Sequence, residues 1–550
     1  MIAKKGNNFD VILVTGEYYD DHPLSPVGVI ARVLDAKGFS VGIIEKPATE
    51  DDFTRLGAPH LCFGVTSGSL DSMLNNYTPM KHSRITDQYS SATQMPDRAV
   101  IVYCNALKRY WKTVPIVIGG IEASLRRFAH YDYWDNAIRK SIMFDSRASI
   151  LVYGNGEKQI IEIAERLQQK RDLDGIEGTC VIRRDIDSSF DVVPSFHEVC
   201  KDPKQFCVMQ QMFSNDKNLA QEYDNNYLVQ YKYPTYTPEF LDWIYSLPFT
   251  RKLHPRSLLM MAKFSVVTHR GCFGDCNFCS LSLHQGERII SRSEESILNE
   301  IKNLTHYPGF KGYIDDLGGP SANMYGMDCT APTSCASRST SSNKNESDSQ
   351  TCLECLSADK SHKRLLFLLR KARKIPGVKK IFIRSGIRYD LALQSQEYIR
   401  EISEHHLSGC LKIAPEHFSE KVLVLMNKDN KRFDEFVDFF TQLNVKKKQS
   451  LRYYFMIGHP GDSVGEVLQL KQKIRKYGLT NIEHFQLFTP TPMTVSSCMY
   501  WTGLNPFTME KIPVVWDYHT KKKLKRILLE DHELQGKHRQ TCDKRDRCDE

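Results

Sequence analysis

The sequence predicts an α/β protein in which a doubly wound N-terminal domain is followed by a partial β/α barrel. Short apolar strand candidates alternate with helical stretches over residues 1–170, and the same alternation restarts near residue 258. Apolar strands separated by helices form parallel sheets that are covered on both faces. The length of 550 residues also exceeds what one hydrophobic core usually supports, so at least two domains are expected.

The first domain contains five apolar segments of strand length. The expected strands lie at residues 9–14, 41–44, 61–65, 115–118 and 150–153. The expected helices lie at residues 27–36, 98–111 and 157–168. A doubly wound sheet of this kind binds ligands at the carboxyl ends of its strands.

The rest of the chain divides into three further parts. Residues 171–257 are less regular and rich in tyrosine and proline, which predicts an extended connector packed on one or both domains. Over residues 258–515, strand candidates return at 264–267, 312–314, 380–383, 410–413, 452–457 and 483–488. Six strand–helix repeats are typical of a partial β/α barrel. A serine-rich stretch at 336–350 predicts a flexible insertion, and residues 516–550 form a basic tail.

The composition is that of an ordinary folded protein, with a net charge of +8. This charge permits an anionic partner such as RNA but does not require one, so nucleic-acid binding stays open. No apolar run is long enough to cross a membrane, and the polar start of the chain lacks the apolar core of a signal peptide. We therefore expect a cytoplasmic protein whose sixteen cysteines bind metal more readily than they form disulfides.

Three cysteines lie close together after the first barrel strand: Cys272, Cys276 and Cys279, in a Cys-x3-Cys-x2-Cys pattern. Iron–sulfur clusters take cysteine thiolates as ligands, and three ligands leave one iron of a 4Fe-4S cluster open to another molecule. The alternatives are a structural zinc site or unrelated buried thiols. Zinc prefers four ligands, and the nearest further candidate, His284, stands five residues past Cys279.

This triplet is the signature of the radical S-adenosylmethionine (radical SAM) superfamily, and further motifs make the chain resemble the YgiQ family over most of its length. They include Gly-Gly-Ile-Glu-Ala-Ser-Leu-Arg-Arg at 119–127, Asp-Leu-Gly-Gly-Pro at 316–320 and Ala-Pro-Glu-His at 414–417. The resemblance implies an enzyme that binds a 4Fe-4S cluster on the three cysteines and reductively cleaves S-adenosyl-L-methionine to a 5′-deoxyadenosyl radical. It also implies an electron donor of the flavodoxin or ferredoxin type.

The same resemblance places four further residues at the cofactor. Phe278, directly before the third cysteine, corresponds to an aromatic residue that lies near the adenine. Gly318 and Gly319 follow the second barrel strand, where a glycine-rich turn approaches the cofactor's amino group. Arg388, past the third strand, would pair with the methionyl carboxylate or the ribose. The alternative for each residue is a structural turn or ion pair.

Three other polar residues follow barrel strands and would face the same mouth. Asp390 lies past the third strand and would act with Arg388 on the carboxylate or the ribose. Glu416 and His417 lie past the fourth strand and would serve as acid/base or substrate-binding groups, because the carboxyl ends of barrel strands carry the chemistry. The sequence does not assign a catalytic residue.

The N-terminal half resembles the cobalamin-binding-like domain that precedes many radical SAM barrels. The base-off cobalamin motif is Asp-x-His-x-x-Gly after the first strand, whereas this chain has Asp-Asp-His-Pro-Leu-Ser at 20–25. Ser25 replaces the glycine, and Pro23 restricts the backbone of His22. These departures make cobalamin doubtful, and His22 is expected to be a loop residue or part of a vestigial or substrate-facing site.

A second group of cysteines, Cys329, Cys335, Cys352 and Cys355, flanks the serine-rich insertion. Cys352 and Cys355 form a Cys-x2-Cys pair, which is a plausible half-site for zinc or an auxiliary cluster. The insertion does not prevent closure of such a site, because loop entropy grows slowly with length. The alternative is a set of mobile thiols in a loop.

The sequence does not specify the substrate. Modification of RNA or of a protein is one hypothesis, suggested by the mild basicity, the tyrosine-rich connector and a similarity to methylthiotransferase barrels. No segment resembling an RNA-binding TRAM domain follows residue 502, which weakens the hypothesis for transfer RNA. The alternative function is a non-catalytic metal-binding or nucleic-acid-binding module on a radical SAM scaffold.

Overall fold

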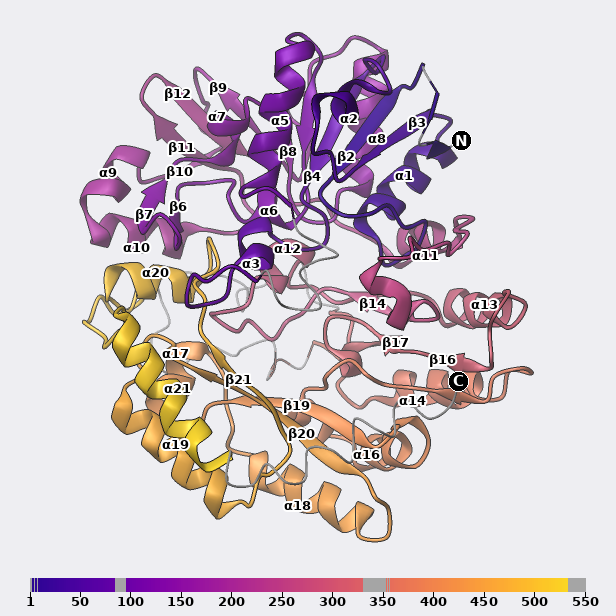
Figure 1. Ribbon diagram of the computed structural model, residues 1–550, viewed down its shortest axis with the longest axis vertical. Helices are drawn as coiled ribbons and strands as arrows, with labels where there is room; N and C mark the ends of the chain where they lie inside the picture. The colour runs from indigo at the N-terminus through magenta and orange to yellow at the C-terminus, as the bar shows by residue number, and fades with distance from the viewer. Residues whose placement is uncertain are drawn as a thin grey trace.

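The computed structural model describes residues 2–3, 5–6, 8–84, 95–329, 353, 355 and 357–532. The expected insertion at 336–350 and the tail from residue 533 onward lie outside these ranges. Figure 1 shows the N-terminal half, in indigo to magenta, stacked on the C-terminal half, in orange and yellow. Along the described ranges, no helix is long and apolar enough to cross a membrane.

The N-terminal half is built on a ten-stranded sheet, with the short β1 (Ile2–Ala3) at one edge. Next to it lie five parallel strands in the order β3 (Val41–Glu45), β2 (Val11–Thr15), β4 (Cys62–Thr66), β5 (Ile116–Ile118) and β8 (Ile150–Val152). The chain therefore passes to one side of β2 to form β3 and then to the other side to form β4. The doubly wound prediction is confirmed, and such a reversal of strand order is where these sheets bind ligands.

Helices cover both faces of this sheet. α1 (Pro26–Ala36) and α8 (Glu157–Gln168) pack in one hydrophobic cluster, and α2 (Glu50–Thr54), α5 (Ala99–Tyr110) and α7 (Ile142–Ser146) pack in another. α1 begins after Ser25, because the side chain of this residue accepts a hydrogen bond from the N–H of Gly28. Pro26 suits the first turn, where its missing N–H costs nothing.

Residues 171–257 differ from the predicted connector, because they add four strands to the same sheet. These are β9 (Thr179–Arg183), β10 (Asp191–Val193), β11 (Leu219–Tyr223) and β12 (Asn226–Gln230), accompanied by α9 (Phe196–Lys201), α10 (Pro203–Met212) and α11 (Pro238–Ser246). The sequence pattern did not indicate these strands because they place polar side chains in the core: Gln221 and Gln230 are fully buried. Their amides donate to the carbonyls of Pro194 (2.9 Å) and Ser214 (2.8 Å), which offsets the cost of burial. The prediction of an extended connector is therefore wrong over these strands.

The C-terminal half consists of short parallel strands wrapped by helices. The strands are β13 (Val266–Val267), β16 (Tyr313–Ile314), β17 (Leu317–Gly318), β18 (Lys380–Ile381), β19 (Cys410–Glu416), β20 (Ser450–Ile457) and β21 (Ile482–Leu487). The outer helices include α13 (Glu294–Thr305), α14 (Lys363–Ala372), α16 (Gln396–Glu401), α18 (Phe433–Asn444) and α19 (Val464–Lys476). An isolated parallel bridge between Ile387 and Ile413 joins the segment after β18 to β19. One hydrophobic cluster fills the space between strands and helices, and the partial β/α barrel is confirmed.

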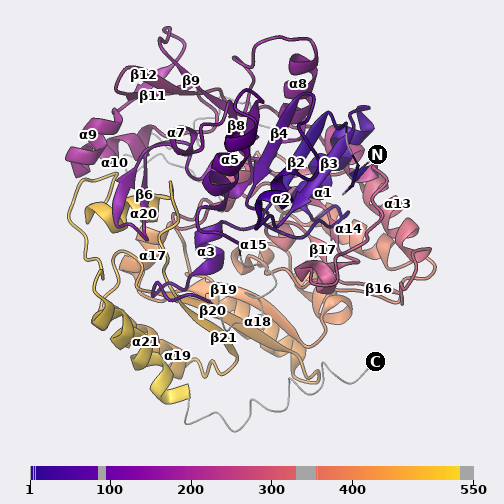
Figure 2. The same cartoon turned by 45° about the horizontal axis from the view of Figure 1, so that its top comes forward.

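The C-terminal segment bridges the two halves. α20 (Val495–Thr502) packs on α10 and on β6 (His130–Asp132), which forms a small hairpin with β7 (Ala137–Arg139). α21 (Tyr518–His532) packs on α19 and β21. Figure 2 shows both yellow helices along one flank of the molecule.

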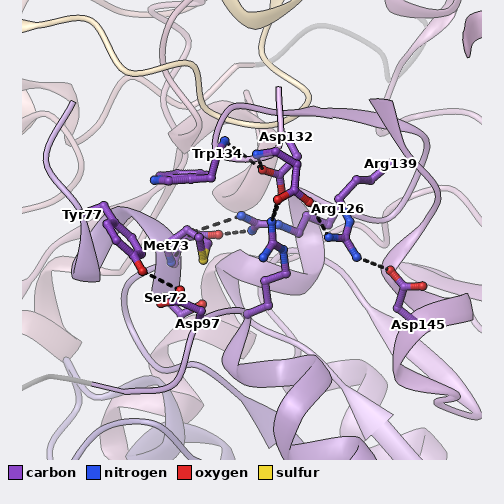
Figure 3. A network of polar contacts seen from close by, with 12 residues as sticks. Ser72, Met73, Tyr77, Asp97, Arg126, Asp132, Trp134, Arg139 and Asp145 are labelled. Atoms are coloured by element: carbon purple, nitrogen blue, oxygen red, sulfur yellow. Dashed lines mark hydrogen bonds and ion pairs between the residues drawn. The ribbon is translucent and has the colours of Figure 1, made fainter. Parts of the chain in front are cut away.

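A buried charged network supports the β6–β7 hairpin (Figure 3). Arg126 is almost fully buried, and its guanidinium pairs with Asp71, the N-cap residue of α3 (Ser72–Asn76). Asp132, at the end of β6, accepts hydrogen bonds from Arg98 at 3.1 Å and from the N–H of Trp134 at 2.9 Å. Burial of these charges is tolerated because each has a partner of opposite sign.

Candidate active site

A loop between the two halves carries the cysteine triplet. It runs from β14 (His269–Arg270), which pairs with β15 (Ile290–Ser291), to α12 (Leu281–Gln285). Figure 1 places α12 between the N-terminal sheet and the barrel. Cys272, Cys276 and Cys279 are free, half-buried thiols. Backbone hydrogen bonds order the loop: the N–H of Cys272 donates to Gly286 at 3.1 Å, and that of Cys279 donates to Cys276 at 2.9 Å.

The thiols are close enough to affect one another's ionisation. Burial, reinforced by the nearby Cys276 and Cys272, raises the pKa of the Cys279 thiol to about 12. Burial also raises the pKa of Cys272. Thiolates at these positions therefore need positive charge beside them. Arg388 brings one, because its Nη1 lies 3.9 Å from the Sγ of Cys276, and Asp390 pairs with the same guanidinium at 2.6 Å.

The donor set suits an iron–sulfur cluster, whose ordinary ligands are cysteine thiolates. Gly274 keeps the inside of the loop open, since a Cβ there would lie 2.6 Å from the Nη1 of Arg388 and 3.4 Å from the Sγ of Cys272. Within the described ranges, no three His, Cys, Asp or Glu side chains surround a point that a single metal ion could occupy. The residues present fit a cluster that three cysteines hold.

Gly271 makes the bend before Cys272, and its replacement provides a test of the loop geometry. Its φ is 86°, and a Cβ there would lie 1.8 Å from the carbonyl oxygen of Arg288. Gly286 has a φ of 90°, but a Cβ there would meet nothing within 4 Å. We expect Gly271→Ala to lower the iron content after anaerobic reconstitution by about half or more, because the backbone of the loop must shift.

Gly286→Ala is the matched control for this variant. It shares the positive φ, which alanine adopts only with strain, without the steric clash. It should therefore keep its iron. Iron analysis together with thermal melting measures both variants, and equal iron contents would show that the contact with Arg288 does not shape the loop.

A cavity of about 670 Å³ lies between the two halves. Gly119 and Gly120, which follow β5 of the N-terminal sheet, line one side. His269, Gly318 and Gly319 of the barrel line the other. The carboxyl ends of the doubly wound sheet and the mouth of the barrel therefore face the same space.

The glycine turn after β17 packs directly against the ring of a buried histidine, His269. A Cβ at Gly319 would lie between 2.6 and 2.8 Å from three atoms of the His269 ring. His269 is fully buried, its Nδ1 lies 2.8 Å from the Oγ1 of Thr268, and among the described residues its Nε2 has no hydrogen-bond partner. Burial lowers the pKa of His269 to about 4, so the ring is neutral at pH 7. Sequence reasoning missed this residue, although its position three residues before Cys272 was a usable signal.

The other residues expected at the cofactor lie around the cysteine loop. Phe278 is half-buried, and its ring lies edge-on to that of His459, with 6.2 Å between centroids. Glu416 is the last residue of β19 and pairs with Lys428 at 3.3 Å. Its negative charge also contributes to the raised pKa of Cys279 in the cysteine loop. His417 is fully buried, so it does not face solvent at the barrel mouth. The structure thus places Glu416 near the cysteine loop and buries His417 in the protein interior.

Two polar contacts join the halves beside the cavity, and sequence reasoning found neither. Glu157, in the first turn of α8, pairs with Arg270 at 2.7 Å. The Nδ1 of His284 in α12 lies 3.0 Å from the Oγ of Ser124 in α6 (Ile121–Ser124). Glu157, Arg270 and His284 all line the cavity. These contacts hold the cysteine loop against the N-terminal sheet.

Comparison with known families assigns most of the chain. Residues 1–266 match the model described as Radical SAM N-terminal, residues 266–474 match the Radical SAM superfamily, and residues 483–536 match a domain of unknown function, DUF3362. A UPF0313 protein of Methanocella arvoryzae is 43% identical over 548 residues, which are 94% of this chain and 90% of the relative. The chain belongs to the UPF0313 (YgiQ) family.

A second curated relative agrees with YgiQ membership. A UPF0313 protein of Clostridium botulinum is 44% identical over 558 residues, covering 96% of this chain and 85% of the relative. Among solved structures, one neighbour is the radical S-adenosylmethionine methyltransferase TsrM of Kitasatospora setae with cobalamin and a 4Fe-4S cluster bound. It aligns with a TM-score of 0.49 and 15% identity, covering 89% of this chain and 78% of that one. OxsB with aqua-cobalamin aligns with a TM-score of 0.48 and 11% identity over 96% of this chain and 56% of that one. As a member of the YgiQ family, the chain is a radical SAM enzyme, as predicted.

In this YgiQ protein, His22 does not fit as a ligand of cobalamin. It is fully buried, and its Nε2 lies 2.9 Å from the carbonyl oxygen of Lys263 and 3.1 Å from the Nη1 of Arg251. Its Nδ1 accepts a hydrogen bond from the N–H of Leu24 at 3.1 Å. Burial, followed by the charge of Arg251, lowers the pKa of His22 to about 3. Both ring nitrogens are thus engaged within the protein, and Ser25 of the same motif caps α1.

The second cysteine group is described only in part. Cys329 and Cys355 are free and half-buried, whereas Cys335 and Cys352 lie outside the described residues. Cys329 forms an isolated antiparallel bridge with Ala358. A metal site at these four cysteines stays a prediction.

Proposed function

We propose that this YgiQ protein binds a 4Fe-4S cluster through Cys272, Cys276 and Cys279 and reductively cleaves S-adenosyl-L-methionine. The observation that carries the proposal is the set of three free thiols in one loop at the barrel mouth, beside Arg388. When bound and reduced by one electron, the two cofactors supply methionine and a 5′-deoxyadenosyl radical that removes a hydrogen atom from a substrate. An external donor of the flavodoxin or ferredoxin type would deliver the electron.

The residues of the cysteine loop and its neighbours would hold the cluster and balance its negative charge. The cysteines provide three ligands, so that one iron stays without a protein ligand. Arg388 stabilises negative charge on the thiolates because its guanidinium is buried beside Cys276, where solvent screens the attraction little. Asp390 orients the guanidinium by accepting from both its Nε and its Nη2.

Gly318, Gly319 and Phe278 would contact S-adenosyl-L-methionine. A glycine turn lets a ligand approach the backbone closely, and Gly319 has this freedom while it rests against His269. The Nε2 of His269, which has no hydrogen-bond partner among the described residues, offers a hydrogen bond at the same wall of the cavity. Phe278, directly before Cys279, offers an aromatic ring that would lie near the adenine.

The cavity between the halves would hold the substrate next to the cofactor. Apolar side chains from the N-terminal sheet, including Val65, Val117 and Val152, line it. Such walls limit water around a reactive intermediate and so prevent side reactions. Modification of RNA or of a protein stays a hypothesis for the substrate.

Cleavage of the cofactor provides the test of this function. Protein reconstituted anaerobically with iron and sulfide, then given dithionite and S-adenosyl-L-methionine, should form 5′-deoxyadenosine and methionine in equal amounts. Chromatography of the quenched reaction measures both products. A protein that carries a full cluster but forms no 5′-deoxyadenosine would refute the proposal.

Gly319→Ala should weaken the binding of S-adenosyl-L-methionine without lowering the iron content. The added methyl group would displace the His269 ring, and overpacking of this kind costs about 1–3 kcal/mol, which corresponds to roughly five-fold or more in affinity. Equilibrium binding to the reconstituted protein measures the effect. Gly386→Ala is the matched control, because a Cβ there would lie 3.7 Å from the carbonyl oxygen of Lys412, an ordinary contact. Equal affinities in the two variants would argue against a cofactor contact at Gly319.

A further inference from the structure

A second cavity, of about 430 Å³, lies where the C-terminal segment meets the N-terminal half. We call it the aromatic–lysine pocket and define it by Lys81, Tyr133, Tyr500, Trp516, Tyr518 and Lys521. Its walls come from the loop after α3, the β6–β7 hairpin, α20 and α21, and Figures 1 and 2 both show the hairpin beside α20. It shares no lining residue with the cavity next to the cysteine loop. It is therefore a separate site.

Two ammonium groups border this pocket. Lys521 is 5% exposed, and its Nζ donates hydrogen bonds to the hydroxyls of Tyr500 at 2.7 Å and Tyr133 at 3.1 Å. The Nζ of Lys81 lies 4.6 Å from the centroid of the Tyr133 ring, and that of Lys521 lies 5.1 Å from the same centroid. The ammonium groups of Lys81 and Lys521 thus both lie over the ring of Tyr133.

No carboxylate neutralises this pair within the part of the chain that the structure describes. Asp517 acts on Lys521, and Asp132 and Asp135 act on Lys81, but none of them forms an ion pair with either lysine. Burial, followed by repulsion from Lys81, lowers the pKa of Lys521 to about 8. A buried cation that lacks a counter-charge is costly, and a bound anion would remove that cost.

The turn that carries Lys81 is held in an unfavourable backbone conformation. Lys81 has a φ of 61°, and the turn is closed by hydrogen bonds of the Lys81 N–H to the carbonyl of Thr78 at 2.9 Å and of the His82 N–H to the Oγ1 of Thr78 at 3.2 Å. Left-handed conformations of non-glycine residues persist where surrounding contacts enforce them, and they concentrate at ligand sites. The turn fixes where the second positive charge stands.

Exposed aromatic rings stand at the entrance of the pocket. Trp516 is 55% exposed and Tyr518 is 45% exposed. The indole is held in place because its Nε1 donates to the carbonyl of Tyr500 at 2.7 Å. An aromatic cage alone would favour a cationic ligand, but the two lysines already supply the positive charge. Fixed aromatic faces next to ammonium groups instead suit a ligand with a planar ring and an anionic group.

We propose that the aromatic–lysine pocket binds a phosphorylated nucleoside. The phosphate pairs with Lys521 and Lys81, and the base stacks on Trp516. The same chemistry is present in a free nucleotide and at the 5′ end of an RNA strand. The pocket does not depend on the cluster, so the proposal stands apart from the function proposed for the cysteine loop.

Isothermal titration of the full chain tests this proposal with adenosine monophosphate, adenosine and inorganic phosphate as probes. Adenosine monophosphate should bind roughly ten-fold or more tightly than adenosine, because the charge-assisted contacts need the phosphate. It should also bind more tightly than inorganic phosphate, because stacking needs the base. Adenosine binding as tightly as its monophosphate, or no binding by any probe, would overturn the proposal.

Variants then locate the site. Lys521→Met and Trp516→Ala should each weaken adenosine monophosphate binding roughly ten-fold or more. Lys522→Met is the matched control, because Lys522 is the exposed neighbour on the same helix, and it should leave affinity unchanged. Lys81→Met alters an exposed side chain and keeps the test valid if the buried Lys521→Met fails to fold, which thermal melting detects. Unchanged affinity in Lys81→Met and Trp516→Ala would overturn the assignment to this pocket.

A short single-stranded RNA identifies the natural source of the nucleotide. Tighter binding of a hexamer with a 5′ phosphate than of adenosine monophosphate supports the proposal and assigns the ligand to RNA. Weaker binding of that hexamer supports the proposal with a free nucleotide as ligand. The alanine triple variant of the cluster cysteines should bind adenosine monophosphate as wild type does, so a failure here is distinguishable from a failure of the radical chemistry.

Discussion

Replacement of Cys272, Cys276 and Cys279 together by alanine is expected to abolish both iron binding and the formation of 5′-deoxyadenosine. Reconstituted wild-type protein should hold about four iron atoms per chain, the content of one cubane cluster, and the triple variant close to none. The physical reason is that, among the described residues, the thiols that act on Arg388 are those of Cys272 and Cys276 in this loop, and His284, the next candidate along the sequence, already contacts Ser124. Iron analysis and the visible absorbance spectrum measure the cluster, and chromatography measures the product.

Cys200→Ala is the matched control for the triple variant. Cys200 is an exposed free thiol in α9, far along the chain from the cysteine loop, and its loss should leave iron content and product formation unchanged. A triple variant that kept its cluster would contradict the choice of ligands. A triple variant that lost its cluster but still formed 5′-deoxyadenosine would contradict the proposed reaction.

The second large effect is expected on stability, when Arg126 is replaced by methionine. The side chains of Arg126 and Asp71 are 3% and 0% exposed, and Glu122 is buried nearby. Although burial opposes the charge, Asp71 and Glu122 together raise the pKa of Arg126 above its ordinary value. Methionine would leave these carboxylates without their cation, so the free energy of unfolding should fall by about 3–5 kcal/mol. Chemical denaturation measures this loss.

Arg139→Met is the matched control in the same network (Figure 3). Arg139 pairs with Asp135 at 2.7 Å and with Asp145 at 2.8 Å, but its side chain is 28% exposed. Its loss should therefore cost about 1 kcal/mol or less. Adding Asp71→Asn to Arg126→Met should recover part of the lost stability, because it removes one buried charge that has no partner. If Arg126→Met costs no more than Arg139→Met, the buried pair does not stabilise this region.

The stability of this network also matters for the aromatic–lysine pocket. Asp132 ends β6 and orders the following turn through the N–H groups of Trp134 and Asp135. The same hairpin carries Tyr133, which contacts both Lys81 and Lys521. A variant that loosens the hairpin should therefore weaken nucleotide binding as well as folding.

Much of the fold was predictable from local pattern. The apolar runs of the parallel strands and the periodic helices between them are encoded over short stretches, because a buried strand needs apolar side chains on both faces. The cysteine triplet was predictable for the same reason, since its three residues lie within one loop and their spacing alone brings them together. Five strands of the N-terminal sheet and the partial barrel therefore appeared where they were expected.

The strands of residues 179–230 were not predictable, because their buried glutamines are satisfied by distant partners. The Oε1 of Gln221 accepts from the N–H of Ala129, and that of Gln230 accepts from the Nε of Arg127. In the sequence alone, a buried glutamine with such partners looks the same as an exposed one. The polar pattern therefore indicated a connector where the fold builds a sheet.

The sequence by itself determined the cysteine spacing, the doubly wound and barrel repeats, and hence the family. Only the tertiary structure decided which distant residues meet: Arg388 reaches Cys276 across 112 residues of chain, and Lys521 reaches Tyr133 across 388. It also decided that His22 is engaged inside the protein and that His269 supports the glycine turn. The physical reason is that short-range spacing specifies groups within one loop or helix, whereas contacts between distant segments form only when the sheet, the barrel and the C-terminal segment pack together.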